Sequence, residues 1–533
     1  MRRVKEDARR PGRLAGGAAV LAAGSMAAKF IGAFYRIPLT NILGAEGMGV
    51  YQLVFPVYAL FITLSTAGIP TALSRIVAEH RARGESAGKY LAAALFTLVA
   101  LSVLAGGLIT ALSHVFARWQ GNPAAACGYA VIAPAVFFAG LVAGFRGWFQ
   151  GEMYMLPTAL SGIVEQLVKL GVGVGLAAAL APRGQNAAVM GAIAGVTVSE
   201  FAAACYLAVT CAVRRKKKGG MREGLRLSAA ERRAMFRTAA PIALLGVIVP
   251  LGAVFDSLIV VNALKWGGAD TASATAMYGL YSGPVTSLVN LPVVAAMSLA
   301  IAVVPSVSAS REERDLGGIL AKSRMSVKLV YLIGVPSSLF LMVFGRDILA
   351  LIYPSLSSAE LSTAAKLLAV AAFGVVLTGA TQIYVSLLQA LDKTKTLIIS
   401  LSFAVLVKVA LSLSLVSRIG VMGAAVAGVG MSAVSLVAVT VTFRRLTGVG
   451  SEKNVAQTLV AGVIMALTAL VVREYVPTHL GAVLAGAAVS AVVYGWLVTL
   501  MGVFTENEVL SLPFGSRLAR IRRKIRFWEN GYD

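Results

Sequence analysis

About fourteen segments of this 533-residue chain are apolar and long enough to cross a membrane. A helix needs about 20 mainly apolar residues to span the hydrocarbon core of a bilayer. With 58% apolar and only 14% charged residues, the composition excludes a soluble globular protein. The sequence predicts an all-α polytopic membrane protein with helices centred near residues 27, 62, 103, 137, 168, 200, 251, 291, 340, 376, 407, 431, 464 and 490.

The 48 Lys and Arg residues, against 24 Asp and Glu, are distributed unevenly between the connections of these segments. One set of alternate connections, in which we count Arg146, holds 37 of the cations, and the other set holds six. This asymmetry predicts a membrane protein with both termini in the cytoplasm. The cations are not interleaved with aromatic residues, so nucleic acid is not expected as a partner. A cleaved signal peptide is the alternative for the N-terminus, but the first apolar run continues through Lys29 to about residue 40.

The longest basic connection divides the first twelve predicted helices into two sets of six. Within it, Ser228 and Glu231 form a capping box that should start a short amphipathic helix. This connection and the basic tail are expected to contact anionic lipids of the inner leaflet, although plain topological anchoring also explains them. The predicted organisation is an N-terminal lobe at 1–213, a basic linker at 214–237, a C-terminal lobe at 238–446, two accessory helices at 447–503 and an amphipathic tail at 504–533.

The two sets of six helices resemble each other. Gln150 precedes Lys169 by 19 residues, and Gln389 precedes Lys408 by the same interval, with an offset of 239 residues between the pairs. Because six helices separate equivalent points, the repeats should run in the same direction, with pseudo-twofold symmetry about the membrane normal. Such proteins place their substrate between the lobes, near the bilayer midplane.

Two cations, Lys29 and Arg36, lie inside the first predicted span. Helical spacing puts them on one face with Ser25 and Gly32. A charge near the bilayer centre costs between ~2.5 and ~17 kcal/mol, so it persists where it faces a partner or a wet cavity. This face is a hypothesis for a functional site. In the alternative, an intramembrane acid holds Lys29 and Arg36 reaches the outer interface.

Few other charges lie within spans. In the fifth segment, Glu165 precedes Lys169 by four residues, which predicts a local ion pair that could simply neutralise itself. Polar faces on the first, fifth and eleventh segments predict one shared cavity with a small cationic surplus, which suits an anionic ligand. The remaining intramembrane charges are Glu200, Asp256 and Lys408.

Signatures of catalysis are lacking. Residues 83–90 (RGESAGKY) only approximate a phosphate loop, and no GxSxG elbow is present. Three histidines and three cysteines are scattered without the spacing of metal ligands or a disulfide framework. We therefore expect a transporter without cofactor or metal, not an enzyme, and leave open a coupling ion of unknown identity.

Several motifs resemble a known family. These are KFIGAFYRIPLTNILGAEGMGVYQ, GIPTALSRIVAE, FRGWFQGEMYMLPTALSGIVEQLVK, PLGAVFDS, YGLYSG and SLLQALDK. Together they resemble the SpoVB and YtgP branch of the polysaccharide-export proteins. That branch is related to the lipid II flippases of the MurJ type, within the MOP superfamily that also contains the MATE drug exporters. The resemblance covers nearly the whole chain but does not specify a substrate.

The resemblance implies a two-lobe flippase with alternating access, a cationic central cavity for a pyrophosphate-linked saccharide, and a groove beside the last two helices for the polyprenyl chain. Two departures weaken the transfer of the MurJ substrate: Gly162 stands where the branch often has Gln, and Arg36 falls one place beyond the second MurJ arginine. By motif position, the substrate-binding residues would be Lys29, Arg36, Glu165, Gln166, Lys169, Asp256 and Lys408.

The sequence thus predicts a flippase for a lipid-linked saccharide, with lipid II for peptidoglycan synthesis as the substrate and the cell-wall synthesis machinery as a partner. Three alternatives stay open. These are a flippase for another envelope or spore polysaccharide precursor, a MATE-like cation or drug antiporter, and a scaffold for envelope synthesis or sporulation that transports nothing.

Overall fold

The computed structural model describes residues 11–66, 68–217, 229–295, 307, 310, 315–447 and 454–503. In these ranges every regular element is a helix, and each of the fourteen predicted centres falls within one. The predicted all-α class is therefore confirmed. Ser228 and the tail at 504–533 lie outside the described residues, so the capping box and the tail helix stay predictions.

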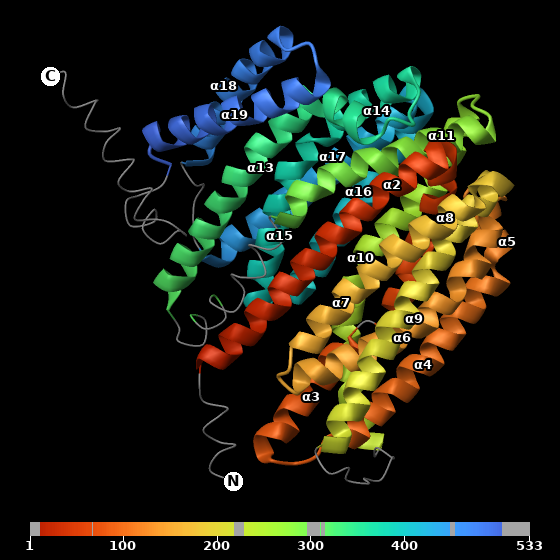
Figure 1. The fold of residues 1–533 in the computed structure, drawn as a ribbon. Helices are drawn as coiled ribbons and strands as arrows, with labels where there is room; N and C mark the ends of the chain where they lie inside the picture. Colours follow the sequence, from red (N-terminus) through yellow and green to blue (C-terminus); the bar gives the residue numbers. More distant parts are fainter. Residues whose placement is uncertain are drawn as a thin grey trace. The chain divides into compact units, whose positions relative to one another are not determined.

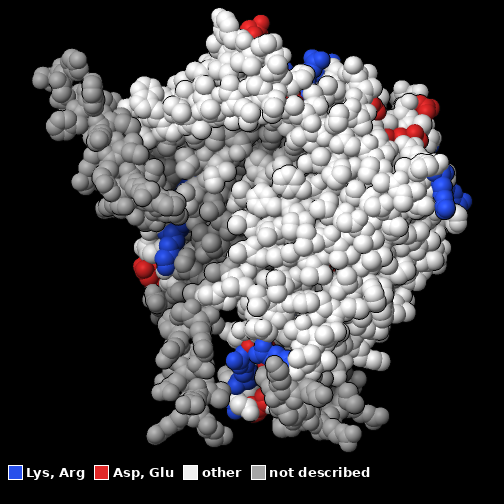
Figure 2. All heavy atoms as spheres, viewed as in Figure 1, with Lys and Arg blue, Asp and Glu red and all other residues white. Residues whose placement is uncertain are grey.

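Twelve helices of the described chain are long and apolar enough to cross a membrane. The first, Val20–Arg83, covers two of the predicted segments, and the segment centred near residue 291 continues into residues that are not described. Figure 2 shows a broad central area without Lys, Arg, Asp or Glu, while the charged side chains in this view lie toward its margins. Many large apolar side chains are exposed on the described chain, and Phe96, for example, is 77% exposed. The chain is a multi-pass membrane protein, since only lipid accommodates so much exposed apolar surface.

Contacts divide the chain into two units, and the first comprises residues 1–287 and 394–427. Its longest helix, α2, bends at Gly44, where φ is +66°. The elements of this unit are α2 (Pro11–Thr66), α3 (Ile69–Arg83), α4 (Gly88–Ala111), α5 (Ser113–Trp119), α6 (Ala125–Gly151), α7 (Leu156–Val168), η1 (Lys169–Gly173), α8 (Val174–Leu180), η2 (Ala181–Arg183), α9 (Gln185–Lys217), α10 (Ala229–Trp266), α11 (Thr271–Leu280), η3 (Tyr281–Val285), α16 (Thr394–Ile419) and the start of α17 (Val421–Thr447).

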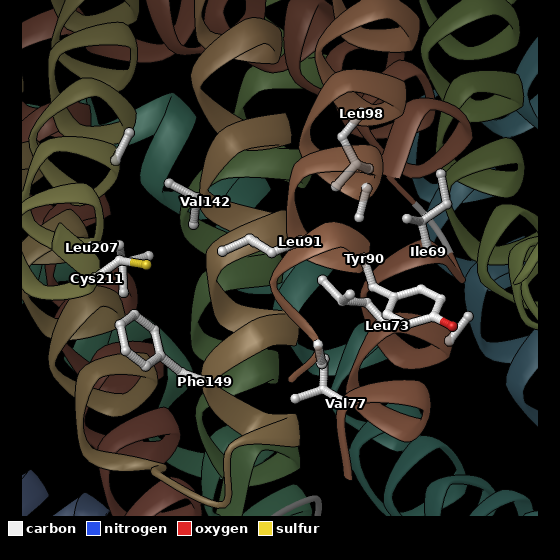
Figure 3. Packing of buried hydrophobic residues seen from close by; sticks show 14 of the residues in the cluster. Ile69, Leu73, Val77, Tyr90, Leu91, Leu98, Val142, Phe149, Leu207 and Cys211 are labelled. Atoms are coloured by element: carbon white, nitrogen blue, oxygen red, sulfur yellow. The ribbon is translucent and has the colours of Figure 1, made fainter. Parts of the chain in front are cut away.

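An apolar core joins α3, α4, α6 and α9 (Figure 3). Leu73, Leu91 and Phe149 are at most 2% exposed and pack against Val142 and Leu207. These side chains recur on one face of each helix, as expected for an interface between helices. The core fixes α6, which carries one wall of the site described below.

The second unit comprises residues 288–393 and 428–533. Within it α18 and α19 lie side by side (Figure 1). Asp347 of α13 joins them, because its carboxylate lies 2.8 Å from Arg473 Nε and 2.7 Å from His479 Nδ1. The described helices of this unit are α13 (Leu316–Ile352), α14 (Ser358–Ala371), α15 (Phe373–Ala390), most of α17, α18 (Asn454–Tyr475) and α19 (His479–Leu500).

The backbone supports the predicted internal repeat. Among the described residues, the non-glycine residues with positive φ are Met153 (54°) and Asp392 (61°), which are 239 residues apart. Each follows the end of a helix, and its N–H donates to the carbonyl of Gln150 or Gln389, at 3.0 and 2.9 Å. The offset of 239 residues therefore relates two backbone turns as well as the repeated Gln and Lys residues. The predicted lobe boundaries stay predictions. The two units are defined by contacts within the chain, and their boundaries lie at other residues than those of the predicted lobes.

Candidate functional site

A cavity of about 580 Å³ lies within the first unit. Its walls come from α2, α6, α7 and η1. The polar and aromatic residues that line it are Ser25, Lys29, Tyr35, Arg36, Tyr51, Phe55, Arg146, Gln150, Thr158, Glu165, Gln166 and Lys169. Five of the seven predicted site residues are thus brought together: Lys29, Arg36, Glu165, Gln166 and Lys169.

Small residues let α2 and α7 approach each other at one side of the cavity. A Cβ atom on Gly24 would lie 2.5 Å from the Cβ of Ala159, and one on Gly32 would lie 2.7 Å from Gln166 Oε1. The residue numbers of the facing positions increase together, from Gly24 and Ala159 to Gly32 and Gln166, so the two helices run in the same direction. Close approach at small residues is the usual means of packing helices in a membrane.

Arg146 is a cavity residue that the sequence analysis missed. It was counted with a connection between helices, which is wrong, because it lies inside α6. Its Nε–H donates to Ser161 Oγ at 2.9 Å, and its Nη2 donates to Glu165 Oε2 at 2.9 Å. The available signal was its position in the sequence, since Arg146 lies 19 residues before Glu165, near the end of the preceding apolar segment.

Glu165 is therefore paired across helices. Gln166 Nε2 donates to its other oxygen, Oε1, at 2.9 Å, so both carboxylate oxygens have partners. The local ion pair predicted between Glu165 and Lys169 is wrong: no ion pair joins them in the described structure, and Arg146 takes that place. Glu165 and Lys169 do line the same cavity, but the ionic partner of Glu165 is Arg146 of α6.

Lys169 lies at the start of a π-helical turn, η1. Its Nζ is 5.0 Å from the ring centroid of Tyr35 and 5.0 Å from that of Phe55. Cation–π contacts of this length attract an ammonium group while leaving its N–H groups able to bind a ligand. Turns of π-helix occur frequently at functional sites.

Among the described residues, the Arg36 side chain makes one long contact, 3.5 Å from Nη1 to Ser287 Oγ. Lys29 is exposed and lines the cavity. The lining carries four cationic side chains, Lys29, Arg36, Arg146 and Lys169, and one carboxylate, Glu165. Glu200 of α9 lies close enough to interact electrostatically with Glu165 and Lys169. The cationic surplus is larger than the sequence predicted.

Asp256 and Lys408 are placed together, but they do not line this cavity. Lys408 Nζ donates to Asp256 Oδ2 and links α16 to α10. Their side chains are only 14% and 13% exposed. The seven predicted residues thus form a group of five and a separate ion pair.

Comparison with known proteins follows from this arrangement. A family described as "Polysaccharide biosynthesis protein" matches residues 14–311, more than half of the chain. The chain belongs to this family. A second family, MatE, matches residues 282–414 of this chain.

Relatives of this family member extend over nearly its whole length. It is 27% identical over 515 residues to stage V sporulation protein B of Bacillus subtilis, covering 94% of this chain and 98% of that protein. It is 22% identical over 477 residues to the lipid II flippase MurJ of the same organism, covering 86% and 87%. These relatives confirm the predicted resemblance to the SpoVB branch and to MurJ.

The fold of this chain also matches a solved structure of the lipid II flippase MurJ in an inward closed conformation. The TM-score is 0.70 at 13% identity, covering 91% of this chain and 99% of the other. The MATE and MurJ type of membrane fold is therefore confirmed. Of the proteins named here, the MurJ relative and the MurJ structure are described as lipid II flippases.

Proposed function

We propose that this chain is a flippase that moves an undecaprenyl-pyrophosphate-linked saccharide, lipid II, from the inner to the outer leaflet by alternating access. One observation carries the proposal: four cationic side chains and one carboxylate line a cavity within helices that are long and apolar enough to cross a membrane. Similarity to a lipid II flippase supports it.

The energetics of an anionic headgroup explain why such a cavity is needed. An unpaired charge transferred to hydrocarbon costs tens of kcal/mol in the Born limit. Arg36, Lys169 and Lys29 would replace the water around the diphosphate, with Glu165 and Gln166 as hydrogen-bonding partners of the headgroup. Asp256 and Lys408 would join the path only after their own ion pair opens.

The membrane potential can supply the driving force. In the proposed orientation, with both termini in the cytoplasm, each negative charge that leaves an inside-negative cell gains ~2.3 kcal/mol per 100 mV. Outward flipping therefore needs neither ATP nor a cofactor, and a coupling ion would be an addition. The basic linker and tail would bind anionic inner-leaflet lipids, and the cell-wall synthesis machinery would consume the product.

A headgroup-accessibility assay in proteoliposomes tests this function. We expect purified protein to expose lipid II headgroups to an impermeant reagent faster than protein-free vesicles do. Equal rates with and without protein, for lipid II and for every other undecaprenyl-linked saccharide tested, would contradict the proposal.

A second substrate is favoured by a specific observation, the 27% identity to a protein named for sporulation. The assay therefore includes undecaprenyl-linked precursors of other envelope or spore polysaccharides. A MATE-like antiporter for cationic drugs is disfavoured, because four cations and one carboxylate repel a cationic ligand. Drug resistance on overexpression would support that alternative, and full activity of cavity variants would support a scaffold.

A further inference from the structure

The cavity has two ends of different chemical character. Because α2 and α7 run side by side in the same direction, position along α7 measures depth. Thr158 and Lys169 are eleven residues apart, which is about 16 Å at the rise of an α-helix. Thr158 and Lys169 are therefore too far apart to serve one diphosphate group.

Uncompensated cations mark one end. Arg36 and Lys169 form no ion pair with a carboxylate in the part of the chain that is described, and aromatic rings flank Lys169. Each cation retains N–H donors for a ligand. This end suits a dianionic group.

Charge compensation marks the α6 and α7 wall of the other end, which extends from Thr158 to Glu165 and which Lys29 of α2 also lines. Arg146 is neutralised by Glu165, yet only two of the five N–H donors of a guanidinium are used in its contacts with Ser161 and Glu165. Gln150 also lines this end and brings a side-chain amide to it. A neutral wall rich in donors suits hydroxyl and amide groups better than a second anion.

Thr158 supplies an independent observation at the compensated end. The residue is 7% exposed and lines the cavity, but its Oγ1 has no hydrogen-bond partner. Buried hydroxyl groups are bonded in the large majority of cases. An orphan hydroxyl in a cavity wall points to a polar ligand.

We propose that Arg146, Gln150 and Thr158 form a saccharide-recognition subsite, while Arg36 and Lys169 hold the diphosphate. This assignment rests on the proposed function and deepens it, because it fixes the orientation of the headgroup along α7. It makes Thr158 and Gln150 specificity-determining residues. Neither was predicted from the sequence.

Binding to the purified full-length protein in detergent tests the assignment with two probes, undecaprenyl diphosphate and lipid II. Thr158→Val and Gln150→Leu should each weaken lipid II binding about three- to tenfold, the effect of one lost hydrogen bond, and leave undecaprenyl diphosphate binding unchanged. Thr97→Val is the matched control, because Thr97 Oγ1 donates to Ala93 O away from the cavity. It should change neither affinity.

Thermal unfolding separates recognition from a structural role. Thr158→Val removes no hydrogen bond within the protein, so its melting temperature should equal or exceed that of the wild type. A variant that loses saccharide affinity without losing stability supports the assignment.

Several outcomes would overturn it. Equal weakening of both ligands, or no change in either, removes the saccharide role of these residues. Wild-type protein that binds a panel of undecaprenyl-linked saccharides no better than undecaprenyl diphosphate also overturns the assignment, while the proposed function stands. Wild-type protein that binds none of these lipids overturns the proposed function together with the subsite.

Discussion

Two polar clusters of the same packing unit differ in how their charges are balanced. The cavity between α2, α6 and α7 holds four cations and one carboxylate, whereas Asp256 and Lys408 form a pair of one cation and one anion. The cations Lys29 and Lys169 line the cavity and aromatic rings flank Lys169, whereas the pair is more than four-fifths buried. We therefore expect the cavity to bind a ligand and the pair to hold helices together.

Charge stoichiometry is what separates these two cases. A buried pair can satisfy itself, although the desolvation of both groups consumes much of the attraction. The surplus of cations over carboxylates in the cavity lining leaves a net positive charge there, which gains from an anionic ligand. The predictions below test this contrast, beginning with the largest expected effect.

Removal of two cavity cations should abolish transport. The double variant Lys29→Gln and Arg36→Gln is expected to lose flipping of lipid II in proteoliposomes, since the diphosphate then loses its replacement for water. The protein should still insert and fold, because glutamine keeps a polar side chain at both positions and the ion pair of Arg146 and Glu165 remains. Arg75→Gln is the control, as Arg75 is a cation that is 72% exposed and pairs with Glu79. Full activity of the double variant would contradict the proposed role of the cavity in binding the lipid II headgroup.

Breaking the buried pair should affect stability instead. Asp256→Asn leaves Lys408 buried without its counter-ion, which typically costs about 3–5 kcal/mol. The double variant Asp256→Asn and Lys408→Met should recover most of that stability in thermal melts. If the single variant melted normally but failed to transport lipid, the pair would belong to the substrate path and the comparison would fail.

Removal of the negative charge that neutralises Arg146 should change ligand affinity by a smaller amount. Glu165→Gln leaves Arg146 without a counter-charge, so inorganic pyrophosphate should bind about three- to tenfold more tightly. Discrimination between lipid II and undecaprenyl diphosphate should fall in the same variant. An unchanged affinity for pyrophosphate would show that Glu165 does not set the charge of this end. Binding titrations with both probes measure the change.

The turns that precede the two lysine-bearing helices offer the smallest effect. Met153→Gly should stabilise the protein by up to about 1 kcal/mol, because a side chain strains a backbone with positive φ. Asp392→Gly should gain less, since Asp tolerates that conformation better. Thermal melts compare the two variants, and a larger gain at Asp392 would contradict this ranking.

The fold was largely predictable because lipid imposes strong rules on sequence. Apolar segments of about 20 residues located all fourteen helical centres, and the 239-residue offset located a repeated turn at Met153 and Asp392. Helical spacing also placed Lys29 and Arg36 on one wall, and Glu165 and Lys169 on another.

Partner choice across helices was not predictable in the same way. The spacing of Glu165 and Lys169 favoured a local pair, but Arg146 from α6 competes for the carboxylate once the helices pack. Arg146 was assigned to a connection because it lies near the end of an apolar segment, where periodicity cannot tell a helix end from a loop. Asp256 and Lys408 are 152 residues apart, and nothing local links them.

The most direct test of the central claim is an experimental map of the protein with bound lipid II. We expect the diphosphate within hydrogen-bond distance of Arg36 or Lys169, with the saccharide toward Arg146 and Thr158. The pair of Asp256 and Lys408 should stay closed in that complex. Diphosphate density bound to Lys408, with Asp256 displaced and the cavity empty, would contradict the account.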